Sequence, residues 1–131
     1  MLKKLALPTI VVFVAWSLMD FVIHVVILSE SYGQTASLWR PEAEMKMGLM
    51  SLVVFISALI LVYIYSKFVA DKSTNTAMQF GTLMGLSVGL SFAYGSYAVM
   101  PLPYYMAMVW FLGSLVEGLV AGVILGYMVK D

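Results

Sequence analysis

Long runs without an ionisable side chain dominate the sequence and predict membrane-spanning helices. Residues 47–66 contain no ionisable group, and neither do residues 73–116. A helix needs about 20 mostly apolar residues to cross the hydrocarbon core of a bilayer. The longer run therefore predicts two helices joined by a tight turn at Pro101-Leu102-Pro103, because two prolines do not continue a helix.

This pattern predicts an all-α integral membrane protein, with four transmembrane helices in an antiparallel bundle and one domain over residues 1–131. A transmembrane barrel is excluded because Leu52 to Val62 does not alternate between polar and apolar residues. The expected helices cover about residues 5–29, 47–68, 78–100 and 104–129, with an outer loop at 30–46.

The outer loop carries its own helix signal. Pro41 is followed by two carboxylates, Glu42 and Glu44. Proline is common at the first helical position, and acids are stabilised in the first turn by the helix dipole. This segment is therefore expected to be the first turn of a helix that leads into the second span.

The distribution of basic residues predicts the orientation. One side of the expected bundle would carry five basic residues and the other only two, Arg40 and Lys46. The five are Lys3, Lys4, Lys67, Lys72 and Lys130. Under the positive-inside rule, both termini are cytoplasmic, and the expected location is a bacterial inner (cytoplasmic) membrane that the chain crosses several times.

Composition supports the membrane assignment and excludes several classes of function. The chain is 63% hydrophobic and 11% charged, against about 25% charged residues in ordinary soluble domains. The formal net charge is zero, so no basic surface for nucleic acid is expected. The absence of cysteine excludes disulfides, thiolate metal sites and cysteine catalysis.

Three ionisable residues fall inside the expected spans: Asp20, His24 and Glu117. Such residues are costly in lipid and are candidates for function. Asp20 and His24 are four residues apart and lie on one helical face, which Trp16 continues. Three interpretations remain open: a buried hydrogen-bonded cluster that fixes packing, a path for a proton, cation or polar ligand, and a metal site.

A polar face on the third expected helix could complete this cluster. Ser87, Ser91 and Tyr94 follow helical spacing on a different side from the glycines of that helix. We expect Ser91 and Tyr94 to lie near Glu117, although ordinary hydrogen bonding between helices explains the same spacing.

Glycines at every fourth position form the second signal. The third expected helix carries Gly81, Gly85 and Gly89, and the fourth carries Gly118, Gly122 and Gly126. Ridges of small residues let helices approach closely in lipid. They predict contacts between helices, either within this chain or with a partner.

No motif predicts an enzyme, a cofactor or a metal site. Phosphate-binding loops, nucleophile elbows and zinc motifs do not occur. A single histidine excludes a bis-histidine haem held by one chain. The pairs Met45 with Met47 and Met106 with Met108 suit Cu(I), but methionine is also a common filler of apolar packing.

Four segments resemble a widespread family of small four-helix bacterial membrane proteins, which has a domain of unknown function. They are Leu38–Met45 (LWRPEAEM), Tyr63–Lys67 (YIYSK), Phe80–Leu86 (FGTLMGL) and Leu115–Gly122 (LVEGLVAG). The similarity spans nearly the whole chain and implies an architecture but no activity.

A looser similarity is to small multidrug resistance transporters, which have a similar size, four helices and an essential acid in the first helix. Asp20 and the segment Leu38–Pro41 carry this similarity. The chain departs from that pattern in the neighbouring His24, the second acid Glu117 and the long outer loop. The similarity implies a transport function in which Asp20 takes part.

Three functions follow from these features. The leading hypothesis is a non-catalytic accessory or structural subunit of a larger membrane complex, packed against other membrane subunits or as a homo-oligomer. The first alternative is a small proton- or cation-coupled transporter that uses Asp20, His24 and Glu117. The second alternative binds a quinone, carotenoid or lipid in a groove lined by Trp16, Tyr94 and Trp110.

Overall fold

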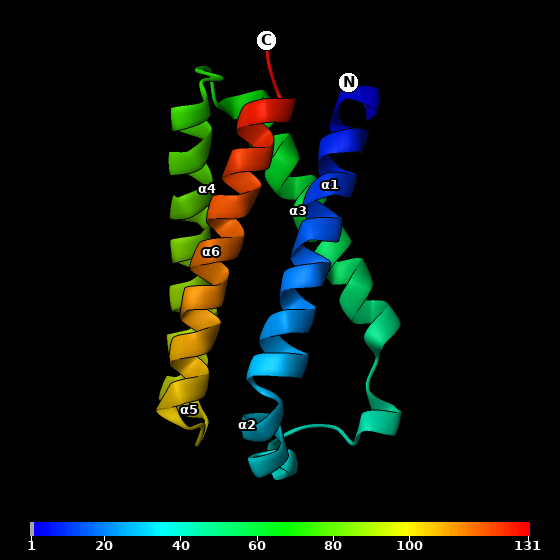
Figure 1. The fold of residues 1–131 in the computed structure, drawn as a ribbon, viewed down its shortest axis with the longest axis vertical. Coiled ribbons are helices and arrows are strands. Elements are labelled where there is room, and N and C mark those ends of the chain that lie inside the picture. The colour runs from blue at the N-terminus through cyan, green and yellow to red at the C-terminus, as the bar shows by residue number, and fades with distance from the viewer. Residues whose placement is uncertain (1) are drawn as a thin grey trace.

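The computed structural model describes residues 2–131 and is helical throughout, with no strand in that range (Figure 1). Three helical runs are long and apolar enough to cross a membrane. The first joins α1 (Leu2–Asp20) to the π-helix η1 (Phe21–Ile27), and the others are α3 (Met47–Phe68) and α6 (Tyr104–Met128). The prediction of an all-helical chain is confirmed.

A fourth helical run lies between α3 and α6. It consists of α4 (Thr74–Gly89), the π-helix η4 (Leu90–Tyr94) and α5 (Gly95–Val99). It is not among the three runs that are apolar enough to span a membrane by composition. The reason is its content of glycine, serine, threonine and tyrosine, together with Asn75 and Gln79 near its start.

The fourth run begins earlier than the sequence predicts, at Thr74 instead of residue 78. Ser73 is its N-cap, and the Ser73 hydroxyl accepts a hydrogen bond of 3.2 Å from the Thr76 N–H. The residues before Met78 include the polar Thr74, Asn75 and Thr76, which do not belong to an apolar run. Polar residues are compatible with a first turn that projects beyond the apolar region.

Asp71 reinforces this helix start and gives it a dependence on pH. Its carboxylate accepts hydrogen bonds from the Thr76 hydroxyl and from the N–H and hydroxyl of Ser73. The bond from Thr76, followed by those from Ser73, lowers the pKa of Asp71. Because the pKa of Asp71 is lower in the folded state than in the unfolded state, its ionised carboxylate stabilises the fold at a pH above the unfolded-state pKa. That stabilisation is lost as the pH falls through the folded-state pKa.

We therefore expect Asp71→Asn to speed hydrogen exchange at the Thr76 and Ala77 amides near neutral pH. The difference from the unmodified chain should disappear once the pH falls well below about 4, where the Asp71 carboxylate is protonated in both states. Amide exchange followed by NMR in detergent would measure it. A difference that is constant with pH would contradict the proposed role of the charge.

The connection between the first and second runs is more structured than the expected loop. It contains α2 (Ser29–Gln34) and two short 3₁₀ turns, η2 (Ala36–Leu38) and η3 (Glu42–Glu44). The prediction that Pro41 starts the helix of the second span is wrong. Pro41 caps η3 alone, which ends at Met45 in extended backbone, and α3 begins separately at Met47.

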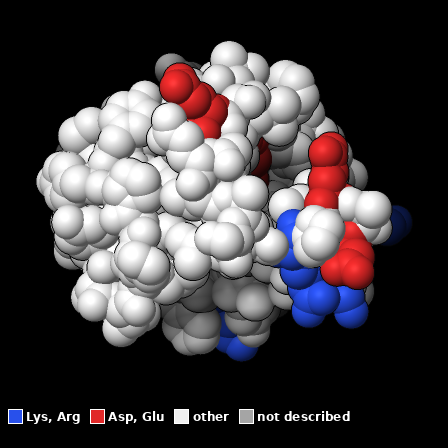
Figure 2. All heavy atoms as spheres, turned by 90° about the horizontal axis from the view of Figure 1, so that it is seen from below, with Lys and Arg blue, Asp and Glu red and all other residues white. Residues whose placement is uncertain are grey.

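The four runs pack as two pairs (Figure 1). One pair is α4 and α6, which make the most extensive contact, and the other is α1 and α3. Helix α1 also contacts α6 and so joins the two pairs. Both termini and the link between α3 and α4 lie at one end, and α2 lies at the other, which we call the α2 end. Seen from that end, the charged side chains gather mainly on one part of the rim (Figure 2).

Candidate functional site

The last residue of α1 and the middle of α6 bring two acids together. The carboxyl groups of Asp20 and Glu117 lie close enough to interact. One turn before Asp20 along α1, the Trp16 indole N–H donates a 2.9 Å hydrogen bond to the backbone carbonyl of Glu117. This bond fixes α1 against α6 at the depth of the two acids, which we call the carboxyl pair.

The chemistry of the carboxyl pair follows from its donors and acceptors. An ionised carboxylate only accepts hydrogen bonds, so two carboxyl groups bond to each other only when one carries a proton. The Oε1 atom of Glu117 is buried and has no donor from the protein. A proton on either acid would allow the two groups to bond to each other, with Glu117 Oε1 left as a further acceptor.

His24 lies one turn after Asp20 along the chain, but its hydrogen-bond partner is not Asp20. Its Nδ1 is 2.7 Å from the hydroxyl of Tyr32 on α2, while Asp20 remains close enough to act electrostatically on the ring. His24 sits in the π-helix η1, and π-helical turns occur frequently at functional sites. The structure thus brings Asp20 and Glu117 together and places His24 between them and the α2 end.

Tyr32 is the centre of a polar and aromatic cluster that the sequence did not predict. Its hydroxyl accepts a 2.9 Å hydrogen bond from the Trp110 indole of α6. The Trp39 ring meets it edge to face at 5.5 Å, and the Trp39 N–H donates to the Thr35 hydroxyl at 2.8 Å. We call His24, Tyr32, Trp39 and Trp110 the α2-end cluster.

The protonation of Tyr32 follows from its surroundings. Burial raises the pKa of its hydroxyl, the hydrogen bond from Trp110 lowers it, and the nearby charge of Asp20 raises it further. The hydroxyl therefore keeps its proton at neutral pH. The Trp110 N–H can only donate, and Tyr32 can in turn donate to His24 Nδ1 when the neutral His24 proton is on Nε2.

The expected contribution of Ser91 and Tyr94 to the polar cluster is wrong. The Tyr94 hydroxyl is 3.1 Å from that of Tyr104, and Ser91 is exposed on the surface of η4. Both residues lie in the π-helix Leu90–Tyr94, whose wider turns change the helical register on which the prediction relied.

The six predicted glycines lie between α4 and α6. A methyl carbon added at Gly81 would stand 2.7 Å from the Cα atom of Gly122, and one at Gly85 would stand 2.5 Å from the Ser114 carbonyl oxygen. The spacing is looser at the ends, where a Cβ at Gly89 or at Gly126 would be 3.0 or 3.1 Å from its nearest neighbour. Gly118 faces Gly81 and Gly85.

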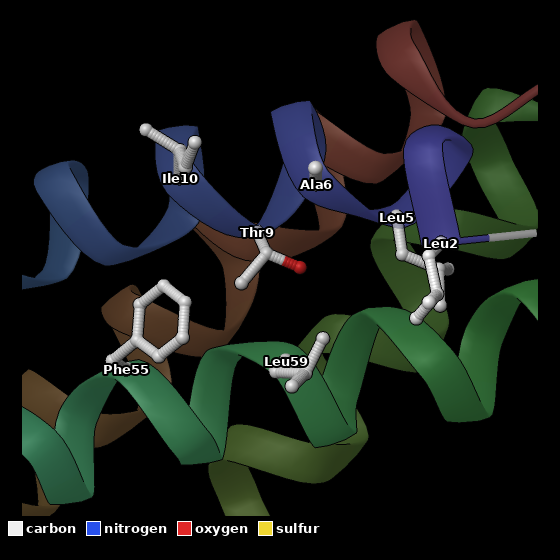
Figure 3. A pocket seen from close by; sticks show the side chains of 7 residues that line it. All are labelled: Leu2, Leu5, Ala6, Thr9, Ile10, Phe55 and Leu59. Atoms are coloured by element: carbon white, nitrogen blue, oxygen red, sulfur yellow. The ribbon is translucent and has the colours of Figure 1, made fainter.

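Two apolar cavities lie beside α1. One, of about 280 Å³, opens between α1 and α3, and Thr9 points into it with a buried hydroxyl that has no partner (Figure 3). The other, of about 490 Å³, lies between η1 and α6. Trp16, Tyr94 and Trp110 line neither cavity, and each has a different hydrogen-bond partner, so the cofactor groove that they were expected to line stays a prediction.

No group of three or more metal-ligating His, Cys, Asp or Glu side chains occurs within residues 2–131. Among the methionines, Met106 is fully buried and receives a weak 3.9 Å contact from the Thr35 hydroxyl, whereas Met45 and Met47 are exposed. Comparisons of the chain with protein families, with curated proteins and with solved structures find no match.

Proposed function

We propose that the chain is a four-span membrane protein that binds and releases a proton at the carboxyl pair, as a small proton-coupled transporter. The observation that carries this proposal is the meeting of the Asp20 and Glu117 carboxyl groups, with the buried Glu117 Oε1 left without a hydrogen-bond donor. Two carboxyl groups bond to each other only through a proton that one of them carries, so such a bond forms and breaks with the gain and loss of one proton.

The membrane setting is supported by the exterior of the fold. Large apolar side chains are exposed along every long run, as at Leu18, Leu52, Leu83 and Leu112. The run from Thr74 to Val99 packs along α6 and is proposed as the fourth span. With both termini at one end, the excess of basic residues at that end assigns them to the cytoplasm, and the α2 end to the outside of a bacterial inner membrane.

Infrared spectroscopy of the protein in lipid tests the shared proton. The unmodified chain is expected to show a C=O band of a protonated carboxyl group near neutral pH. The band should be absent in Glu117→Gln and in Asp20→Asn, because either amide replaces the shared proton by a fixed N–H donor. Glu30→Gln, which changes an exposed acid on α2, is the matched control and should leave the band unchanged.

Coupled transport is tested with acid-loaded vesicles that contain a pH-sensitive dye. Amino acids, sugars and metal cations, added one at a time, serve as probes. A transported solute should release protons through the unmodified chain, and Asp20→Asn and Glu117→Gln should abolish that release while their expression is unchanged. A carboxyl band that survives both substitutions would show that the pair holds no shared proton and would overturn the proposal.

A second candidate, an accessory subunit of a membrane complex, is favoured by α3. All seven residues from Met47 to Val53 are exposed, so two turns of this helix are only loosely covered by the rest of the chain. In Figure 1, α3 diverges from α1 toward this end. Helices in membranes are held by contacts with neighbours, and a second membrane subunit would supply them here.

Photo-crosslinking from position 50 tests this candidate. A crosslinking residue at Met50, exposed in the free segment, is expected to capture another polypeptide in native membranes, whereas one at Ala58, which is fully buried, should capture none. If Met50 yields no adduct and the native protein purifies as a monodisperse species without another polypeptide, the accessory role is wrong.

A further inference from the structure

We infer that the carboxyl pair exchanges its proton with the α2 end, by a relay through His24 and Tyr32, and not with the end that holds the termini. The inference rests on the proposed proton binding at Asp20 and Glu117. It adds the side on which the proton enters and leaves, and two residues that carry it.

The relay is visible as a sequence of contacts along one direction. His24 follows Asp20 by four residues on the same helical run, His24 Nδ1 is 2.7 Å from the Tyr32 hydroxyl, and Tyr32 belongs to α2, the short helix at that end. Neighbouring residues of α2, Glu30 and Gly33, are exposed. The titratable groups that face His24 are Asp20 on α1 and Tyr32 on α2, with Glu117 on α6 beyond Asp20.

Trp110 gives the relay its direction of hydrogen bonding. Its N–H donates to the Tyr32 oxygen at 2.9 Å, and the relay uses the tautomer in which Tyr32 donates to His24 Nδ1 and the His24 proton is on Nε2. Trp110 is itself held by a stacked contact with Phe92 at 4.7 Å. Tyr32 and His24 are thus already within hydrogen-bond distance for a proton transfer.

The opposite direction offers no comparable route in residues 2–131. Toward the termini, the buried core around α1, α3 and α6 is apolar, as at Val12, Val62 and Leu125. It contains two buried hydroxyls, of Thr9 and Tyr65, and neither has a hydrogen-bond partner. The Trp16 bond to the Glu117 carbonyl lies between this core and the carboxyl pair and provides no proton that can be exchanged between acids.

Each inward step conserves protons. Water at the α2 end gives a proton to Tyr32 Oη, while the Tyr32 O–H bond breaks and its proton forms an N–H bond at His24 Nδ1. The His24 Nε2 proton then passes to the Asp20 carboxylate, directly or through one water. One proton has entered and one carboxylate is protonated. Release to the same side reverses both transfers and restores the starting tautomer of His24.

The test uses the full chain in lipid vesicles of one orientation. The chain has no cysteine, so a single Ser37→Cys substitution in the exposed connection allows a membrane-impermeant maleimide to report which side the α2 end faces. The pH is then changed rapidly on one side only, and the carboxyl C=O band is followed in time.

The band is expected to follow a pH change at the α2 end at least about tenfold faster than one at the other end, and Tyr32→Phe should slow the faster response about tenfold or more. The final intensity of the band should be unchanged in Tyr32→Phe, because the carboxyl pair is intact. Tyr105→Phe, at an exposed tyrosine for which no side-chain hydrogen bond occurs, is the control and should respond like the unmodified chain.

His24→Ala provides a second variant in case Tyr32→Phe does not fold. It should show the same slow response, and imidazole added at the α2 end should restore the rate. Equal responses to pH on both sides, or an unchanged rate in both variants, would overturn the relay while leaving the carboxyl pair in place. Absence of the band in the unmodified chain would instead overturn the proposed function.

Discussion

Gly81→Ala is expected to lower the free energy of unfolding by about 2 kcal/mol, the usual cost of overpacking a tight contact. The added methyl group would stand 2.7 Å from the Cα atom of Gly122, and the nearest atoms belong to backbone, which cannot rotate away. Helices α4 and α6 must separate to accept it. Reversible unfolding in mixed micelles, followed by circular dichroism, measures the change.

Gly95→Ala is the matched control on the same helical run. No atom lies within 4 Å of a Cβ at Gly95, and the substitution is expected to be neutral or to stabilise the helix by up to about 1 kcal/mol. If Gly81→Ala and Gly95→Ala unfold alike, the approach of α4 to α6 does not depend on glycine at position 81.

The unmodified chain is expected to lose stability as the pH is raised until both members of the carboxyl pair are ionised. Two negative charges about 4 Å apart repel by about 4 kcal/mol at an effective dielectric constant of about 20. Asp20→Asn removes the repulsion but leaves the Glu117 carboxyl group buried, so its unfolding free energy should fall less steeply with pH over the same range. Unfolding measured across a pH series detects the difference.

Glu30→Gln again serves as the control, because Glu30 is exposed and its loss should leave the alkaline destabilisation unchanged. A double-mutant cycle with Asp20→Asn and Glu117→Gln isolates the interaction between the two groups. If the two substitutions are additive, the carboxyl groups do not share a proton in the folded protein.

The helix boundaries that the sequence predicted well have a strong local cause. The prediction for α3, residues 47–68, agrees with Met47–Phe68, because Lys46 and Lys67 border a run with no charge. The start of α6 follows Pro103 directly, because proline lacks an N–H and is well tolerated at a helix start, where Pro103 is the N-cap. The first run, in contrast, begins at Leu2 instead of residue 5 and ends at Ile27 with a π-helix that no residue type announces.

The candidate site was predictable in part. Burial in lipid is costly for any acid, so Asp20 and Glu117 are identified by their position in apolar runs, and their meeting requires only that α1 and α6 are neighbours. The partner of His24 was not predictable. Tyr32 belongs to a segment, Tyr32-Gly33-Gln34, that indicates a turn, and its contact with Trp110 spans 78 positions of the chain.

The two acids lie on different halves of the fold: Asp20 is on α1, which packs with α3, and Glu117 is on α6, which packs with α4. If the pair shares a proton as proposed, that proton links the two halves, and its loss leaves two like charges facing each other across them. The glycines keep α4 and α6 in close contact, so a response to that repulsion is expected where α1 meets α6. The proposed protonation site is thus also the place where the packing of the two halves would depend on charge.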